Sequence, residues 1–262
     1  MSQQNSPPVL LITSCVIITD DDVVLRDPKD RVKHTIEAIE HWIKIAPHLP
    51  IVICDGSNYD FTATLKEKFP SKDFECLYFQ NSIERVKIQG KGYGEGEIIE
   101  FALENSILLN NAQFFIKCTG KLWVENFAEC FKESRGEFRA SAYFKNTFSL
   151  FKKTSFEYID TRFYFSSVDF YKKYFLRAYE QVGLENKLSI EHVFKNIILK
   201  ERLMGVLFTV HPVICGVGGG NGKYYKNSIK RRIKDRIRIF LVKNSKKFLF
   251  LFTPSQHNAC KY

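Results

Sequence analysis

Three polar segments of the sequence carry residue types that could hold a phosphorylated nucleotide. They are residues 55–57 (DGS), the glycine-rich segment 90–96 (GKGYGEG) and segment 117–121 (KCTGK). Glycine-rich turns bind phosphate oxygens through backbone N–H groups, lysine ammonium groups add positive charge, and a carboxylate can accept hydrogen bonds from a base or ribose. The residues that we assign to donor binding here are Asp55, Gly56, Ser57, Lys91, Gly92, Thr119, Gly120 and Lys121.

Two of these segments also have simple structural explanations. Residues 55–58 (DGSN) are typical of an ordinary turn. The glycines of segment 90–96 alternate with other residues, so they match neither the dinucleotide-binding fingerprint nor a Walker A loop. A flexible turn before a helix would explain them equally well.

Acidic residues at predicted helix starts are candidates for proton transfer and acceptor binding. Glu191 lies in the first turn of a predicted helix, where it could deprotonate an acceptor hydroxyl, although helix capping is the competing explanation. Glu95 and Glu97 are candidates for acceptor binding, and stabilisation of a helix dipole would also explain them. His192 is a further acceptor candidate that could instead be a packing or surface residue.

Four charged residues complete the candidate site. Arg31, at the start of the first predicted helix, and Lys223, after the glycine-rich loop 216–222, are assigned to the donor. That loop could close over the donor as a lid that excludes water, or it could simply connect the body to the tail. Asp160 and Arg162 flank the end of a strand and are assigned to the acceptor, although the arginine could equally pair with a buried acid.

The elements that must position these residues alternate between strand and helix in the first half of the chain. Continuous β-branched runs indicate buried parallel strands, whereas apolar residues at helical spacing indicate helices. The predicted strands are Val9–Thr19, Ile51–Cys54, Glu75–Gln80, Gln113–Cys118, Arg139–Phe151, Asp160–Ser167 and Val206–Ile214. The predicted helices are Asp30–Ile45, Phe61–Phe69, Glu97–Leu109, Val168–Tyr179 and Ser189–Leu203.

This alternation predicts an α/β fold with a mostly parallel central sheet flanked by helices. Ligands of such sheets bind outside the carboxyl ends of the strands, so we expect the polar segments to share a crevice there. No repeat or linker divides the body. We therefore predict one domain, residues 1–226, followed by a tail, residues 227–262.

The whole excess of positive charge lies in one C-terminal segment. The net charge is +10, but residues 223–247 hold eleven of the 39 basic residues and one of the 29 acids, which leaves 28 of each elsewhere. A nucleic-acid-binding domain spreads its charge over a face, so we expect no nucleic-acid partner for the body.

The seven cysteines form no CxxC pair, which favours free thiols in a reducing cytosol and makes zinc improbable.

The tail itself has the pattern of a helix that lies in a membrane surface. In residues 227–252 five apolar residues share one helical face and Lys and Arg cover the other: Ile229, Ile233, Ile237, Phe240 and Leu241. Residues 248–252 (FLFLF) would be buried in the bilayer next. Neither a secretory signal nor a run long enough to span a membrane is found. We expect a cytoplasmic protein, peripheral at the inner face of the cytoplasmic membrane; a nucleic-acid arm is the rival explanation.

Several of these motifs together resemble bacterial glycosyltransferases of capsule and lipopolysaccharide gene clusters, which have a GT-A-like nucleotide-binding fold. They are residues 55–58 (DGSN), 90–106 (GKGYGEGEIIEFALENS), 114–127 (FFIKCTGKLWVENF) and 211–225 (HPVICGVGGGNGKYY). The resemblance spans roughly residues 9–225. It implies a base or ribose pocket beside Asp55, a basic residue at position 31, and a donor site near residues 119–121. The partners that it implies are a nucleotide-sugar donor and a glycan or lipid-linked glycan acceptor.

The sequence departs from the GT-A pattern at the metal motif. Many GT-A enzymes carry Asp-x-Asp where this chain has residues 117–121 (KCTGK), and a divalent cation needs oxygen ligands. A lysine can supply positive charge to the leaving phosphate instead, so metal-independent transfer is predicted, with no cofactor and with Mg²⁺ or Mn²⁺ not excluded. The acidic run at residues 20–22 (DDD) is interpreted as a solvated loop rather than a metal site.

Two other classes of function remain open. A nucleotidyltransferase that forms a sugar nucleotide could use the same framework, but it would usually place a glycine-rich loop directly after the first strand, where residues 14–22 have none. A non-enzymatic membrane-binding or nucleic-acid-binding module would not need the polar strand ends.

Overall fold

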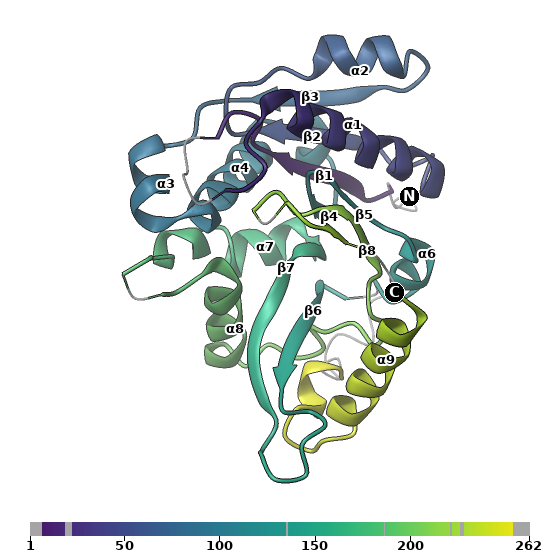
Figure 1. The fold of residues 1–262 in the computed structure, drawn as a ribbon, viewed down its shortest axis with the longest axis vertical. Helices are drawn as coiled ribbons and strands as arrows, with labels where there is room; N and C mark the ends of the chain where they lie inside the picture. The colour runs from purple at the N-terminus through teal and green to yellow at the C-terminus, as the bar shows by residue number, and fades with distance from the viewer. Residues whose placement is uncertain are drawn as a thin grey trace, which may run out of the picture.

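The central sheet has six strands in the order β3-β2-β1-β4-β7-β6, seen in the computed structural model of Figure 1. The structure describes residues 7–18, 23–134, 136–185, 187–220, 222–225 and 228–253, so the acidic run 20–22 lies outside the described residues. The first four strands, β1 (Val9–Ser14), β2 (Ile51–Asp55), β3 (Phe74–Tyr78) and β4 (Phe114–Thr119), are parallel. The last two, β7 (Ser155–Ser167) and β6 (Phe138–Lys145), are antiparallel.

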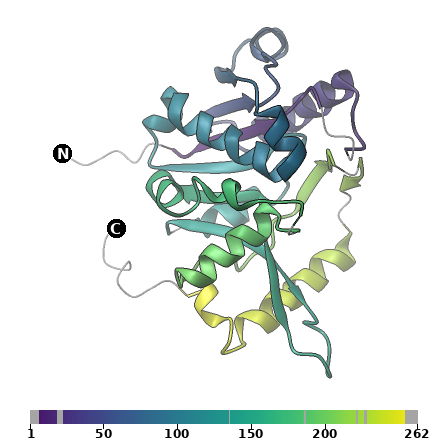
Figure 2. The same ribbon diagram turned by 90° about the vertical axis from the view of Figure 1, so that its left-hand side faces the viewer.

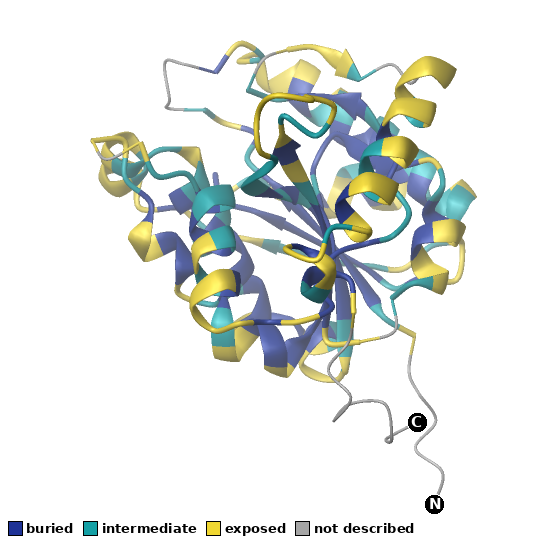
Figure 3. Ribbon diagram, turned by 90° about the horizontal axis from the view of Figure 1, so that it is seen from below, coloured by how far each residue is buried: buried dark blue, intermediate teal, exposed yellow. Residues whose placement is uncertain are grey.

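Helices cover both faces of this sheet. On one face lies α1 (Pro28–Ile45), whose Ile39 and Trp42 are buried with residues of α2 (Thr62–Lys68) and α6 (Phe127–Lys132). On the other lie α4 (Lys91–Asn105), α7 (Val168–Tyr174) and α8 (Ile190–Lys200), with Ala102 and Phe194 in a second cluster. Viewed from below in Figure 3, buried strands occupy the centre and helices expose their outer sides. The prediction of an α/β fold with a mostly parallel central sheet flanked by helices is confirmed.

Local sequence explains where the main helices begin. Asp27 caps α1: its side chain accepts a hydrogen bond of 2.7 Å from the backbone N–H of Lys29. Pro28 occupies the first helical turn, where a backbone N–H would have no partner within the helix, so its missing N–H costs no hydrogen bond. Ser167 caps α7 in the same way by accepting from Phe170. Shorter connecting helices are α3 (Ile83–Gln89), α5 (Ile107–Asn110) and the 3-10 turn η1 (Ala178–Gln181).

Two predicted elements differ from the structure. Residues 91–96 are the first turns of α4 rather than a loop, and the predicted strand Val206–Ile214 is a strand only from Ile214 onwards. A second sheet of three short strands holds that later segment: β5 (Leu122–Val124), β8 (Ile214–Val217) and β9 (Tyr224–Tyr225), in the order β5-β8-β9. In place of a strand, residues 206–208 contribute one bridge between Leu207 and Ala140.

The C-terminal segment forms α9 (Ile229–Lys243) and the 3-10 turn η2 (Leu249–Leu251). The five apolar residues predicted to share one helical face are exposed, among them Ile229 (77%) and Phe240 (65%). The opposite side packs on the body through Val242. Phe248, Leu251 and Phe252 are buried in the core, so the prediction that residues 248–252 enter a bilayer is wrong. No helix among the described residues is long and apolar enough to cross a membrane.

A long hairpin, β6–β7, projects from the sheet beside α9 (Figures 1 and 2). Its turn carries Phe148, Leu150 and Phe151, and the last two are 94% and 96% exposed. The Phe148 ring lies 5.6 Å from Lys234 Nζ and 5.7 Å from Arg238 Cζ, so the turn contacts α9. Large apolar side chains this exposed at a protruding turn are typical of an interaction surface.

Candidate active site

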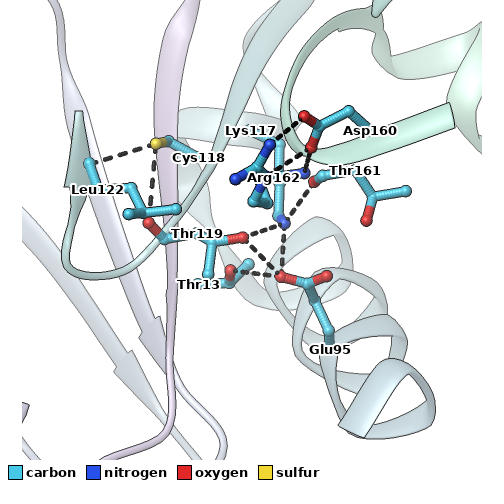
Figure 4. Close-up of polar contacts among 9 residues, drawn as sticks. All are labelled: Thr13, Glu95, Lys117, Cys118, Thr119, Leu122, Asp160, Thr161 and Arg162. Atoms are coloured by element: carbon cyan, nitrogen blue, oxygen red, sulfur yellow. Dashed lines mark hydrogen bonds and ion pairs between the residues drawn. The ribbon is translucent and has the colours of Figure 1, made fainter. Parts of the chain in front are cut away.

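A buried ion pair joins α4 to the carboxyl ends of β1 and β4 (Figure 4). Lys117 is fully buried, and its Nζ lies 2.5 Å from Glu95 Oε1, 2.8 Å from Thr119 Oγ1 and 2.8 Å from the carbonyl of Thr161. The same Glu95 oxygen accepts hydrogen bonds from Thr119 and, at 3.3 Å, from Thr13. A buried lysine is stable only with such partners. Glu95 therefore links the carboxyl ends of β1 and β4, and its side chain keeps 22% of its surface exposed.

A second cation cluster lies at the same edge of the sheet. Lys121 and Arg31 are both buried, and Arg31 donates hydrogen bonds of 2.7 Å to the carbonyls of Cys15 and Leu25. Burial, with a smaller contribution from the nearby Arg31 cation, lowers the pKa of Lys121 to about 7. Lys121 also has a φ of 69°, a left-handed conformation that costs roughly 1–2 kcal/mol in an L-residue. Two buried cations in proximity form a site that an anion would stabilise.

The glycine-rich segment of residues 218–220 lies against these cations. A methyl group added to Gly219 would stand 3.0 Å from Lys121 Cε and 3.4 Å from Arg31 Nη1, and one on Gly220 would stand 2.9 Å from Lys91 Nζ. The segment is held by bonds from the N–H groups of Val24 and Leu25 to its carbonyls. Three predicted donor-binding cations, from α1, α4 and the end of β4, thus converge on one backbone segment.

The turn after β2 is packed rather than open to a ligand. Asp55 is fully buried, and its carboxylate accepts hydrogen bonds from the backbone N–H groups of Val16, Ser57 and Tyr59 and from the Ser57 hydroxyl. Ser57 Oγ accepts two more from Val16 and Ile17. A methyl group on Gly56 would lie 2.5 Å from the Asn81 side chain. These residues hold the loop after β1 in place, which corrects the prediction that they contact a base or ribose.

The glycines of segment 90–96 serve helix packing. A methyl group on Gly96 would stand 2.1 Å from Tyr179 Cβ, and one on Gly92 would stand 3.1 Å from Ile190 Cβ. They lie one turn apart, so they let η1 and α8 approach the helix backbone; the assignment of Gly92 to phosphate binding stays a prediction. Glu97, on a different side of α4, accepts a hydrogen bond of 3.0 Å from the N–H of Ser82 and so fixes the start of α3. That contact is structural, unlike the predicted acceptor role.

The end of β4 is a close crossing of two backbones. The Gly120 N–H donates a hydrogen bond of 2.7 Å to the carbonyl of Thr13, and a methyl group on Gly120 would lie 2.7 Å from that same oxygen. Glycine is therefore required here for the approach of β1. Thr119 Oγ1 belongs to the Glu95–Lys117 cluster. Lys223, also predicted to bind the donor, accepts a hydrogen bond at its carbonyl from the N–H of Gly218.

Asp160 and Arg162 form a pair on β7, on either side of Thr161 (Figure 4). The guanidinium donates to both carboxylate oxygens, at 2.8 Å and 2.5 Å. Burial opposes ionisation of Asp160, but the bonds and charge of Arg162 outweigh it, so the pKa of Asp160 lies below its usual value. Arg162 also stacks on the Tyr225 ring at 5.1 Å. The predicted alternative, an arginine paired with a buried acid, is what the structure contains.

Glu191 and His192 lie at the start of α8, close to the first turn of α4. Their neighbour Ile190 packs on Gly92. His192 Nδ1 lies 2.8 Å from Ser189 Oγ, and its ring centre lies 5.9 Å from that of Tyr158, with the two ring planes tilted by 59°. Glu191 is partly exposed, and its charge contributes to raising the pKa of Tyr158, after burial and the nearer Asp160.

One cleft of about 310 Å³ has no counterpart in the sequence-based predictions. It lies between α9, α6, residues 209–214 and Tyr225, and Arg162 of β7 also lines it. Lys117 was also missed as a site residue. A lysine within the apolar run 114–118 (FFIKC) was a usable signal, because an unpaired lysine is not buried in a strand. Among the described residues, no three His, Cys, Asp or Glu side chains converge as a metal site would require.

The sequence and the structure of the chain were compared with those of known proteins. No protein-family model matches the chain, and no curated protein matches its sequence. Solved structures similar to it include core-mannan synthase A of Aspergillus fumigatus, with 8% identity, a TM-score of 0.48, and coverage of 96% of this chain and 88% of that one. Mouse xyloside xylosyltransferase 1 has 12% identity and a TM-score of 0.45, with 77% and 84% covered.

The similar structures are not all glycosyltransferases. The inositol-1-phosphate CTP transferase of T. maritima has 11% identity and a TM-score of 0.47, with 92% of this chain and 98% of that one covered. At such identities the likeness is one of fold alone.

Proposed function

We propose that the chain is a glycosyltransferase that moves a sugar from a nucleotide-sugar donor to a growing surface glycan of the lipopolysaccharide or capsule type. The observation that carries this proposal is the pair of buried cations, Arg31 and Lys121, at the carboxyl ends of β1 and β4 beneath the backbone of Gly219. A phosphate group placed there would gain charge-assisted hydrogen bonds where the chain offers few counter-ions. Lys91 and Lys223 belong to the same proposed donor site.

Transfer would proceed as a displacement at the anomeric carbon of the donor. The acceptor hydroxyl oxygen forms the new bond to that carbon, and the bond from the carbon to the phosphate oxygen breaks. The electron pair leaves with the nucleotide phosphate, whose charge Lys121 and Arg31 stabilise. In an inverting reaction the hydroxyl proton passes to a base, for which Glu191 is our proposal because it is partly exposed near the start of α4. Positive charge from these side chains would serve where many GT-A enzymes use a metal ion.

A thermal-shift screen tests the donor site directly. The purified chain is heated with UDP-, GDP- and CMP-sugars, each with Mg²⁺, with Mn²⁺ and with EDTA. We expect one nucleotide class to raise the melting temperature in EDTA as well as in metal. A strict metal requirement would contradict the role of Lys121, and stabilisation by CTP or UTP with Mg²⁺ but by none of the nucleotide sugars would indicate nucleotidyl transfer instead.

The base is tested in the same preparation. Glu191→Gln keeps the size and polarity of the side chain but cannot take up a proton. We expect it to abolish turnover of the sugar identified in the screen while the donor affinity stays within about twofold. Full activity in Glu191→Gln would remove it as the base, and loss of donor affinity would assign it to binding.

We further propose that α9 and the β6–β7 turn hold the enzyme on an anionic membrane surface. The exposed apolar face of α9 is flanked by basic residues, and the turn places Leu150 and Phe151 beside Lys152 and Lys153. Each basic residue near an anionic surface contributes roughly 1 kcal/mol, and the apolar side chains add burial. The location that follows is the inner face of the cytoplasmic membrane.

Vesicle sedimentation tests this membrane contact. The wild type should sediment with vesicles of phosphatidylglycerol and phosphatidylcholine but not with phosphatidylcholine alone. Ile229→Ser/Phe240→Ser and Leu150→Ser/Phe151→Ser should each reduce the bound fraction. The matched control, Ile88→Ser/Ile107→Ser, removes side chains that are 65% and 72% exposed on other helices and should bind like the wild type. Equal losses in the control would contradict a specific docking surface.

A further inference from the structure

The cleft beside α9 is lined by an unusual number of guanidinium groups. Its arginines are Arg162, Arg231, Arg232 and Arg236, and its acids are Glu129 and Asp235. His211 also lines it, and burial lowers the pKa of that imidazole. The lining of this arginine cleft therefore carries two more positive than negative charges. Arginine is the side chain best suited to bind phosphate, because its planar fork donates two parallel hydrogen bonds.

The buried acid of the cleft already has cationic partners. Asp235 is buried, and its carboxylate oxygens lie 2.5 Å from a side-chain nitrogen of Arg238, 3.5 Å from one of His211 and 3.9 Å from one of Arg231. Glu129 accepts a hydrogen bond of 3.3 Å from the Asn126 side chain and is otherwise exposed. Asp235 therefore fixes the wall of the cleft and does not neutralise the remaining arginines.

Two arginines of the cleft have no acidic partner within the described part of the chain. Arg232 and Arg236 form no ion pair with any described acid, and they lie one turn apart on α9. Their spacing places both guanidinium groups at the same wall. Their charges are available to a ligand.

An apolar surface borders these two arginines. Ile229, Arg232, Arg236 and Phe240 are spaced by three or four residues, so they follow one another along one side of α9. Ile229 and Phe240 belong to the exposed apolar face described above. A ligand in the cleft could therefore have a charged group among the arginines and a hydrocarbon chain on that face.

Residues 160–162 of β7 connect the cleft to the Glu95 cluster. Arg162 lines the cleft and is paired with Asp160, and the carbonyl of Thr161 between them accepts a hydrogen bond from Lys117 of the Glu95 cluster.

We infer that the arginine cleft binds the phosphate or diphosphate group of a lipid-linked acceptor, with its hydrocarbon chain along the exposed face of α9. That this lipid is the acceptor rests on the proposed glycosyl transfer. The binding of a phosphorylated lipid in the cleft does not depend on it. It assigns the cleft a ligand with both a phosphate group and an apolar chain. Free phosphate lacks the apolar chain, and a bulk anionic phospholipid carries its phosphate only as a singly charged diester.

Isothermal titration calorimetry with farnesyl diphosphate in a non-ionic detergent tests the cleft. Farnesol and inorganic pyrophosphate are titrated separately as the two halves of that probe. We expect the wild type to bind farnesyl diphosphate more tightly than either half. Arg232→Gln/Arg236→Gln should weaken it at least about tenfold, because each charge-assisted hydrogen bond contributes about 1.5–3 kcal/mol.

Two controls isolate the site. Lys230→Gln/Lys246→Gln removes the same charge from the same C-terminal segment outside the cleft, and it should change the affinity by less than about twofold. Lys121→Met alters the proposed donor site and should leave farnesyl diphosphate binding intact. If it abolishes that binding, the diphosphate occupies the donor site and the inference is overturned.

The remaining outcomes separate this inference from the proposed function. Pyrophosphate binding as tightly as farnesyl diphosphate would make the cleft a site for free anions, and equal competition by phosphatidylglycerol vesicles would make it a general lipid contact; either result overturns the inference. Arg232→Gln/Arg236→Gln should keep its thermal shift with the nucleotide sugar. A chain that binds nucleotide sugars but not farnesyl diphosphate keeps its proposed function and loses this acceptor site.

Discussion

Replacing Lys121 by methionine tests the donor site through its dependence on pH. The pKa of Lys121 is about 7 in the folded chain, because the ammonium group is buried beside Arg31. If the donor phosphate binds only the protonated form of Lys121, the dissociation constant of the donor rises as Lys121 loses its proton. If the bound lysine stays protonated, affinity should fall about 30-fold between about pH 6 and about pH 8.5. Nucleotide sugars have no phosphate group that titrates in this range.

The variant should lose both the affinity and its pH dependence. At about pH 6, the methionine lacks a charge-assisted hydrogen bond of about 1.5–3 kcal/mol, so the donor should bind roughly 10- to 100-fold more weakly. Calorimetric titration of wild type and Lys121→Met with the nucleotide sugar from the screen provides the measurement. A wild-type affinity that stays flat across the range, or a variant that retains the wild-type slope, would refute the assignment of Lys121 to the donor phosphate.

The same substitution has an opposite effect on stability. The folded value of about 7 lies below the usual 10.5, so the unfolded chain binds more protons between these values and stability from this group rises with pH across that window. Below about pH 7 both states are protonated, and the cost of burying the charge is complete. Lys121→Met should therefore raise the melting temperature most at low pH. Such a trade-off, in which a residue needed for binding lowers the stability of the fold, is typical of functional sites.

Three further substitutions test the surroundings of the site. Gly219→Ala should weaken nucleotide-sugar binding with a change of less than about 0.5 kcal/mol in urea unfolding, because its methyl group enters the space beside Lys121; unchanged binding would contradict the position of the anion. Glu95→Ala should lower the free energy of unfolding by about 3 kcal/mol because it leaves Lys117 charged and buried, whereas Glu95→Leu/Lys117→Met should recover most of it. Gly96→Ala should lower the free energy of unfolding by about 1–3 kcal/mol because its methyl group clashes with Tyr179. The higher helix propensity of alanine offsets up to about 1 kcal/mol of this loss, and a variant more stable than the wild type would disprove the packing role.

Sequence reasoning succeeded where a signal is local. The buried strands β1, β2 and β4 appear as uninterrupted apolar runs, and α1 has both an apolar period and an Asp-Pro start. It failed at segment 90–96 because glycine has low helix propensity, and the contacts that make it helical come from Tyr179 and Ile190, nearly a hundred residues later. Likewise, residues 248–252 were apolar enough for a bilayer, but Phe248 instead packs against Phe144 of β6.

The candidate site was recovered in part for the same reason. Arg31, Lys91 and Lys121 were identified by type and position, and the structure brings them to one backbone segment. Asp55 and Ser57 were of equally suitable types, yet the N–H groups of Val16 and Ile17 occupy their oxygens. Sequence shows which residues can bind a ligand, but whether the chain already uses them depends on a loop some forty residues away.

The strand β7 links the arginine cleft to the buried Glu95–Lys117 pair, and this arrangement makes a prediction about coupling between the cleft and the donor site at the same edge of the sheet. The carbonyl of Thr161 holds Lys117, while Arg162, the next residue, lies in the arginine cleft and is fixed by Asp160. A ligand phosphate in the cleft would compete with Asp160 for Arg162, because both bind the same guanidinium edge. Any resulting shift of residues 160–162 would reach Lys117 and Glu95 through one hydrogen bond. We therefore expect farnesyl diphosphate to change the affinity for the nucleotide sugar in the wild type, and to leave it unchanged in Arg232→Gln/Arg236→Gln, in paired titrations; identical donor affinities with and without the lipid would show that the sites are independent.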